Sequence, residues 1–139
     1  MKIEIQRIDE KFKMEARNES GNTLYIDSSK ATGGNEEAFR PMQMILAALG
    51  GCSSIDVISI LKKQHLEPFD LKVTVDGERD TGKDVNLFLK VHVHFIFKGN
   101  LPIEKAERAV QLSIEKYCSV AKTLEAGGTK ITSSVELRP

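Results

Sequence analysis

Hydrophobic and polar residues alternate along the N-terminal third of the chain with the period of two that is typical of half-buried β-strands. The alternation predicts strands over residues 1–7, 11–16 and 23–27. A turn composition, Glu-Ser-Gly-Asn at 19–22, separates the last two. Three short strands with tight turns indicate an antiparallel meander. The polar residues 28–39, with two adjacent glycines, predict a loop.

A long helix is predicted over residues 42–64, where apolar positions recur at steps of three and four. Pro41 suits its first turn, because the missing N–H of proline has no partner to lose there. The segment is apolar over most of its surface, which is typical of a helix in the middle of a fold. Gly50 and Gly51 each cost about 1 kcal/mol relative to alanine inside a helix. They therefore indicate close approach of another helix, or access to the neighbouring thiol.

The C-terminal half predicts two further strands, two helical segments and a final strand. Pro68 is expected to end the first helical region, and Pro102 to open the second. The predicted segments are strands at 69–76 and 86–98 with a turn at 80–84, helices at 103–117 and 119–124, and a strand at 129–137. The order βββ-α-ββ-α-α-β predicts an α+β fold with an antiparallel sheet, as a single domain over residues 1–139.

Composition and charge narrow the function classes. The chain has 40% hydrophobic and 29% charged residues, which is typical of a globular protein. Twenty basic residues balance twenty acidic ones, so a nucleic-acid partner is not expected. We find no run of eighteen apolar residues and no leader pattern, so we expect no membrane partner. A cytoplasmic location is therefore expected, where two cysteines favour reactivity over a structural disulfide.

The two cysteines lie in helix-like segments far apart in the chain. Cys52 follows AALGG in AALGGCSSIDVISILKKQ, and Cys118 lies in KYCSVAKTL. Small neighbours leave room around Cys52, and a helix beginning near Cys118 would bring amide dipoles to its sulfur. Two interpretations remain open from the residues. The thiols form a redox pair, or they are buried cysteines that act as small apolar residues.

Three other side chains could bind a metal ion or change the pKa of a cysteine. His92 and His94 share one face of a predicted strand, at a spacing that permits a shared metal. Without a third ligand, solvent-facing polar positions are the simpler interpretation, and no cofactor is expected. Asp56 lies one helical turn after Cys52. A nearby anion would raise the pKa of a cysteine, so we expect Asp56 to act as a cap or to contact a partner group.

The two cysteine segments together resemble the OsmC/Ohr family. The resemblance lies in RPMQMILAALGGCSSIDVISILKK and EKYCSVAKTLE, and it extends over nearly the whole chain. It implies an OsmC-like fold in which a sheet wraps a long central helix. In this family the first cysteine attacks a hydroperoxide and the second resolves the sulfenic acid as a disulfide. By position, Cys52 is similar to the peroxidatic cysteine and Cys118 to the resolving one.

This sequence differs from the family pattern at the residues that activate the thiol. Studied members use an arginine oriented by a glutamate ten residues before the first cysteine. That position is Met42 here, and Gln43, its neighbour, is the candidate for the role. Arg40 and Arg17 are the candidates for the arginine, and neither matches the family register.

The resemblance also implies an intertwined homodimer. We expect it to bury the helix face with Ile45, Leu49, Ile55 and Ile58. The expected activity is reduction of organic hydroperoxides, with a dithiol as reductant. The alternative is a non-enzymatic member of the fold that binds an apolar ligand or responds to redox conditions through its thiols. A metal-dependent role for the two histidines is the third possibility.

Overall fold

A computed structural model describes residues 1–67 and 69–139 and divides the chain into two compact units, 1–45 and 46–139. The order of helices and strands is the predicted one. The expected end of the first helical region at Pro68 lies outside the described residues. Division into units does not test whether residues 1–139 form a single domain, so that remains a prediction.

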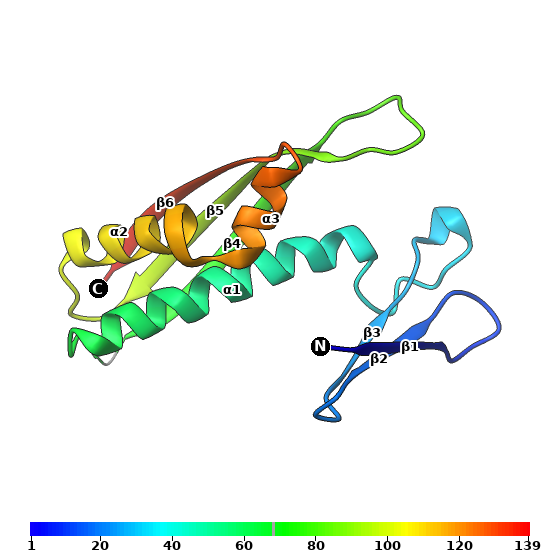
Figure 1. Ribbon diagram of the computed structural model, residues 1–139, viewed down its shortest axis with the longest axis horizontal. Helices are drawn as coiled ribbons and strands as arrows, with labels where there is room; N and C mark the ends of the chain where they lie inside the picture. The colour runs from blue at the N-terminus through cyan, green and yellow to red at the C-terminus, as the bar shows by residue number, and fades with distance from the viewer. Residues whose placement is uncertain (68) are drawn as a thin grey trace. The chain divides into compact units, whose positions relative to one another are not determined.

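The first unit holds the predicted meander. Its strands are β1 (Ile3–Arg7), β2 (Met14–Asn18) and β3 (Thr23–Ile26), paired antiparallel in the order β1-β2-β3. They are the blue strands of Figure 1. Alternation places Ile3, Ile5 and Leu24 on one face, where each is about half exposed. The described part of this unit therefore leaves an apolar sheet face uncovered.

The predicted loop 28–39 is organised by one buried carboxylate. Asp27 accepts hydrogen bonds from the backbone N–H groups of Ser28, Asn35 and Glu37, at 2.7, 3.3 and 3.1 Å. A short 3-10 turn, η1 (Lys30–Thr32), lies between these contacts. Because the loop has few apolar residues to bury, these polar contacts define its shape.

The second unit contains a three-stranded sheet whose pairing differs in part from the prediction. Its strands are β4 (Asp70–Arg79), β5 (Phe88–Lys98) and β6 (Lys130–Arg138). β4 and β5 form the predicted antiparallel hairpin, but β6 runs parallel to β5, so the sheet is mixed. The physical reason is the connection: the chain crosses over through helices before β6 and therefore returns in the same direction.

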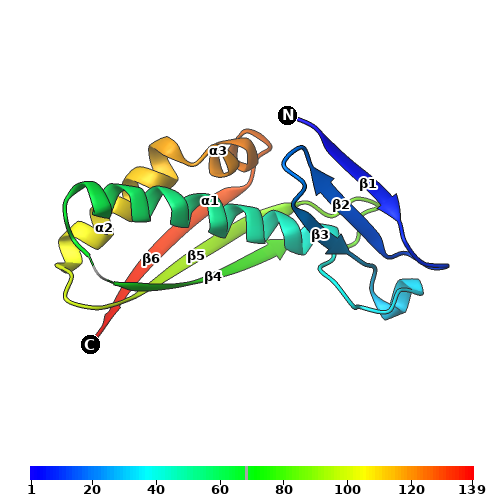
Figure 2. The same ribbon diagram turned by 90° about the horizontal axis from the view of Figure 1, so that it is seen from below.

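Three helices lie on one face of this sheet, as Figures 1 and 2 show for α1 from Leu46 onward, α2 and α3. Their bounds are α1 (Pro41–Lys63), α2 (Ile103–Leu112) and α3 (Ser119–Ala126). The helix-facing side of β5 is buried at Val91, Val93, Phe95 and Phe97, which are at most 1% exposed. Alternation along β5 thus supplies the centre of the core.

The segment predicted as one helix over 103–117 changes its winding before it ends. After α2 the chain widens into a π-helical segment, η2 (Ser113–Tyr117). Here the N–H of Cys118 donates to the carbonyl of Ser113, five residues earlier, at 2.8 Å. Such bulges occur frequently at functional sites, because they change which side chains face a neighbouring element.

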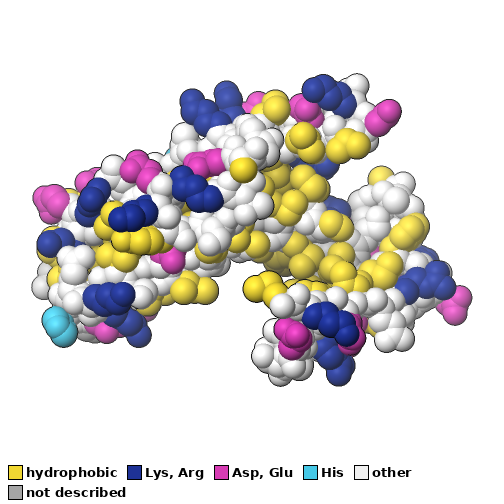
Figure 3. Space-filling view, viewed as in Figure 1, with side chains coloured by type: hydrophobic (Ala, Val, Ile, Leu, Met, Phe, Trp, Pro, Cys, Tyr) yellow, Lys and Arg dark blue, Asp and Glu magenta, His cyan; other side chains and the backbone are white. Residues whose placement is uncertain are grey.

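Helix α1 is covered by its own chain on only part of its surface. Its most apolar window has a mean hydropathy of 1.9 and is 28% buried. By length and composition alone it could cross a membrane, but a helix packed in a protein core passes the same test. Leu49 is fully buried within the chain, whereas Ile55 is 70% exposed. Figure 3 shows in yellow the hydrophobic side chains at the surface.

The two glycines of α1 differ in their surroundings. A Cβ on Gly50 would lie 2.9 Å from Cγ2 of Val75, so the close approach is that of strand β4 and not of another helix. A Cβ on Gly51 would meet no atom within 4 Å in the described chain. Packing against β4 therefore explains the glycine at position 50, whereas Gly51 lies on the uncovered side of the helix.

We expect Gly50→Ala to lower the free energy of unfolding, because overpacking usually costs about 1–3 kcal/mol. Val75 is β-branched and held in a strand, so it cannot easily rotate away. The gain of about 1 kcal/mol from alanine in a helix offsets part of this cost, so the net loss is expected to be at most about 2 kcal/mol. Denaturant unfolding checks this, with Val75→Ala as the background that removes the overlap. An equal loss in both backgrounds would contradict the explanation.

Candidate functional site

Cys52 is half-buried on α1, next to serines that bond back into the helix. The hydroxyl of Ser53 donates to the carbonyl of Leu49 at 2.8 Å, and that of Ser54 to the carbonyl of Gly50 at 2.6 Å. Each serine thus satisfies its own polar group one turn back, so it can lie in a packed region. The hydroxyl residues beside Cys52 have a structural role in the helix.

Cys118 is fully buried at the beginning of α3, as the sequence predicted for a helix N-terminus. It occupies the N-cap position with extended backbone, and its Sγ accepts a hydrogen bond from the N–H of Ala121 at 3.4 Å. Because η2 ends at Tyr117, the π-helical segment leads the chain directly into this cap. Both thiols are free in the structure.

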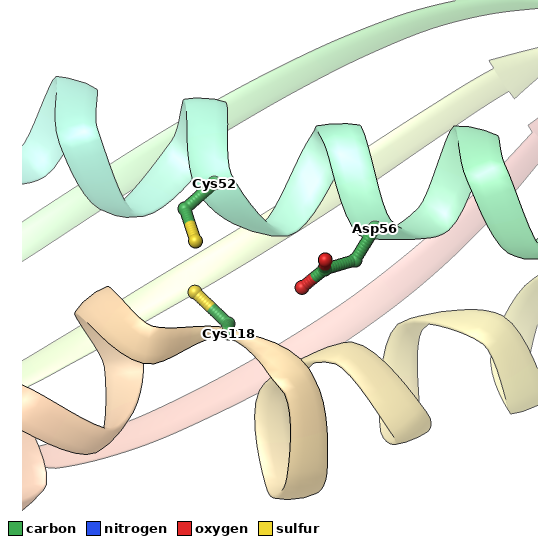
Figure 4. Close-up of side chains that lie close together, drawn as sticks. All are labelled: Cys52, Asp56 and Cys118. Atoms are coloured by element: carbon green, nitrogen blue, oxygen red, sulfur yellow. The ribbon is translucent and has the colours of Figure 1, made fainter.

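The structure brings both thiols together with the carboxylate of Asp56. The Sγ atoms of Cys52 and Cys118 and a carboxylate oxygen of Asp56 all lie within 4.8 Å of one another. Figure 4 shows the two sulfurs pointing toward each other from α1 and from the start of α3, with the Asp56 carboxylate turned into the same space. Cys52 and Asp56 share a helix face because they are four residues apart.

Asp56 is held in this position by a residue that the sequence analysis did not single out. The hydroxyl of Ser113 donates to Oδ2 of Asp56 at 2.9 Å and lies 3.3 Å from the carbonyl oxygen of Ser53. The expected contact of Asp56 with a partner group is thus confirmed. A signal for Ser113 exists in the sequence: it continues the apolar stripe of Ala106, Ala109 and Val110 on α2, where a polar residue needs a buried partner.

The pKa of the Cys118 thiol is raised to about 11. Burial is the largest cause, and Cys52 and Asp56 raise it further. The Ala121 N–H at the helix N-terminus acts in the opposite direction, but it does not overcome burial. The expected favourable effect of the amide dipoles on Cys118 is therefore present and outweighed, so the thiol holds its proton at neutral pH.

An open cavity of about 590 Å³ borders the cluster at Asp56 and includes neither cysteine in its lining. It is lined by both polar and apolar side chains of α1, the residue after it, α2 and η2. Its lining residues are Asp56, Ser59, Ile60, Lys63, Gln64, Leu112 and Tyr117. A ligand in this cavity would reach the carboxylate of the cluster before either sulfur.

The candidate activating residues make local contacts within the first unit. Oε1 of Gln43 accepts a hydrogen bond from the backbone N–H of Arg40 at 3.0 Å, which caps the beginning of α1. The Arg40 guanidinium donates to Glu36 at 2.8 Å, and that of Arg17 donates to Glu15 at 3.1 Å. A part for these residues in the chemistry of the thiols remains a prediction.

The two strand histidines form a hydrogen-bonded ladder with β6. His92 bonds to the hydroxyls of Thr132 and Ser134, both at 2.7 Å. His94 bonds to the Ser134 hydroxyl at 2.7 Å and to Glu136 at 3.2 Å. The ladder follows from the parallel register, which places these positions side by side. Over 1–67 and 69–139, three potential ligands converge at Cys52, Asp56 and Cys118, and not at the histidines.

Comparison with known proteins is consistent with this arrangement. The family model of the OsmC-like protein matches residues 33–134. Protein YhfA of Escherichia coli K12 is 41% identical over 119 residues, which cover 85% of this chain and 84% of that protein. A hypothetical protein from Aquifex aeolicus VF5 has a TM-score of 0.79 at 27% identity, over 99% of this chain and 97% of that one.

A more distant structure shares the fold alone. It is an organic hydroperoxide resistance protein OsmC from Legionella pneumophila, with a TM-score of 0.68 at 17% identity, over 98% of this chain and 97% of that one. The family match spans most of the chain and includes both cysteines. The chain therefore belongs to the OsmC-like protein family.

Proposed function

We propose that the protein is a thiol-dependent peroxidase that reduces organic hydroperoxides. Cys52 is the attacking residue and Cys118 the resolving one. The observation that carries the proposal is the meeting of two free thiols, 66 positions apart, in one partly accessible cluster. Reversible disulfide formation needs thiols that meet after small movements, and this geometry supplies them.

The proposed catalytic cycle uses both thiols, a hydroperoxide and a dithiol reductant. The thiolate of Cys52 attacks the O–O bond of the hydroperoxide, which gives a Cys52 sulfenic acid and an alkoxide that leaves as the alcohol after taking a proton. The sulfur of Cys118 then attacks the sulfenic sulfur as its proton passes to the departing hydroxyl, so water leaves and a disulfide forms. A dithiol reductant restores both thiols by exchange.

The environments of the two sulfurs support this division of roles. Cys52 is half-buried, so a hydroperoxide can approach it, whereas Cys118 is fully buried and cannot meet bulk peroxide. The raised pKa of Cys118 keeps it a neutral thiol at rest. A residue in this state is protected from direct oxidation, since the thiolate is the reactive form. It still lies next to the sulfur that it would have to attack.

Relatives support the proposal only through the shared fold and family. The Legionella protein is named an organic hydroperoxide resistance protein, and its identity of 17% carries no residue roles. The name of protein YhfA states no activity. The support is therefore the cysteine geometry itself.

A second candidate function is favoured by the cavity and by the cap of α1. A non-enzymatic apolar-ligand binder, or a redox-responsive thiol protein, would use the space beside Ile60, Leu112 and Tyr117. Gln43 is occupied as a cap, and it offers no charge with which to orient an arginine. Peroxide turnover distinguishes the two functions.

We also propose a homodimer that covers the exposed side of α1. Gly51 and Ile55 lie one turn apart on that side, a small residue next to a large exposed apolar one. The β1–β3 sheet leaves a second apolar face uncovered, and soluble proteins rarely expose large patches of this kind. Leu49 is excluded from such an interface because its own chain buries it. We propose that this dimer is cytoplasmic, since the reducing cytosol would keep its thiols reduced.

The peroxidase proposal predicts that Cys52→Ser abolishes consumption of cumene hydroperoxide in the presence of a dithiol. Cys118→Ser should instead permit one attack and leave a Cys52 sulfenic acid, which a dimedone adduct in mass spectrometry would report. Peroxide-treated wild type should contain the intramolecular Cys52–Cys118 disulfide. Wild-type turnover in Cys52→Ser would refute the peroxidase, and a bound apolar compound without turnover would favour the second function.

The raised pKa of Cys118 predicts a specific dependence of its reactivity on pH. Its alkylation should stay slow at neutral pH and rise as the pH approaches about 11, because only the thiolate reacts. Asp56→Asn removes one group that raises this pKa, so the rise should begin at lower pH. Peptide-resolved mass spectrometry after timed alkylation measures both. Rapid alkylation of Cys118 at neutral pH in the folded wild type would contradict this.

The proposed dimer predicts that Ile55→Glu weakens self-association, because it would bury a carboxylate in an apolar contact. Sedimentation at micromolar concentration should show a dimer for the wild type and a shift toward monomer for the variant. Val85→Glu, at a similarly exposed position between β4 and β5, is the matched control and should remain dimeric. A monomeric wild type would exclude the dimer.

A further inference from the structure

We propose that the reduced protein binds one zinc ion, or a similar thiophilic divalent ion, through Cys52, Asp56 and Cys118. These three side chains bring two sulfurs and a carboxylate oxygen within 4.8 Å of one another. Zinc–sulfur bonds of about 2.3 Å and zinc–oxygen bonds of about 2.1 Å in a tetrahedron place ligand atoms about 3.5–3.8 Å apart. Small rotations of the side chains, without backbone movement, would close the remaining gap.

Two of the ligands lie on one helix, and the third is the N-cap residue of another. Cys52 and Asp56 are one turn apart on α1, so their side chains leave the same face. Cys118 faces them from the N-cap of α3. A site built on helices keeps its geometry better than one built on loops, because packing restricts the side chains.

Groups around the cluster already orient the ligands. The Ser113 hydroxyl holds Oδ2 of Asp56 at 2.9 Å, which leaves the other carboxylate oxygen for an ion. The Ala121 N–H donates to the sulfur of Cys118. Outer contacts of this kind typically change metal affinity by about 10–100-fold when removed. Ser113 is thus a positioning residue in this proposal.

The donor set selects the kind of metal. Two thiolates favour zinc and related ions over magnesium or calcium, which prefer oxygen ligands. Both sulfurs bind a metal as thiolates, so protons compete with the ion and its affinity falls at low pH. Three protein ligands leave a fourth tetrahedral position for water. The open cavity beside Asp56 gives water a route to it.

Metal binding would compete with oxidation at the same sulfurs. A disulfide or a sulfenic acid cannot supply the two thiolates, and bound thiolates are shielded from peroxide. The ion would therefore protect the reduced thiols, and oxidation would release it. The proposal does not depend on peroxidase activity, because this ligand set can bind metal whether or not Cys52 turns over peroxide.

The test uses the reduced full-length protein and two metals. Competition with a chromophoric chelator should give one zinc per chain. Cobalt substitution should show a thiolate-to-cobalt charge-transfer band and intense visible bands of tetrahedral cobalt. Asp56→Asn should weaken zinc binding at least about tenfold, and Ser113→Ala by about 10–100-fold, by loss of the outer contact. Loss of either sulfur, in Cys52→Ser or Cys118→Ser, should remove the charge-transfer intensity of that thiolate.

Matched controls separate this cluster from other candidate ligands. Asp76→Asn, on an exposed strand position, and the His92→Ala/His94→Ala double variant should bind zinc as the wild type does. Zinc should slow alkylation of Cys52 in the wild type and less so in Asp56→Asn, a readout that does not require cysteine variants to fold. Equal affinity of wild type and Asp56→Asn, or zinc retained by the disulfide form, would overturn the proposal.

Discussion

The candidate site depends on one hydrogen bond, from the N–H of Cys118 to the carbonyl of Ser113. This bond spans five residues, so the chain widens between α2 and α3 where an α-helix would have continued. The widening ends the helix at Tyr117 and places Cys118 at an N-cap with extended backbone. It also leaves the Ser113 hydroxyl bonded to Asp56 on α1. A regular helix over the same residues would present different side chains to α1.

Burial and charge act together on the cluster that results. Cys118 is fully buried beside a carboxylate and a second thiol, and both conditions favour its neutral form. Cys52 and Asp56 are half-buried, and Asp56 borders an open cavity. The arrangement thus separates an accessible thiol from a protected one while keeping their sulfurs adjacent. Both the proposed redox cycle and the proposed metal site use this asymmetry.

Helix α1 connects the site with the rest of the fold by facing in two directions. One side packs on β4, where Val75 leaves no space for a side chain at Gly50. Another side carries Ile55 and is not covered by its own chain. The apolar character that the sequence shows around the whole helix is therefore only partly used within one copy, which is the physical basis for the proposed dimer.

Periodicity in the sequence determined the order of the elements and most of their bounds. Alternation along β5 is a local signal that burial follows directly. Helix α1 is apolar on most sides, so its steps did not separate the buried Leu49 and Val57 from the exposed Ile55. Resemblance to the OsmC/Ohr family singled out Cys52 and Cys118 as a pair, and the structure brings them together. A serine in the apolar stripe of α2 was a signal for Ser113 that the analysis did not use.

Only the tertiary structure decided the direction of β6, the widened turn before Cys118 and the partners of Asp56, Gln43 and the strand histidines. Strand direction depends on where the preceding helices return the chain, which no local pattern specifies. A π-helical turn is marginal on its own, so it is selected by the packing of neighbouring elements. The pKa of Cys118 depends on its burial and on Cys52 and Asp56, which are distant in the sequence. The fold alone brings these groups together.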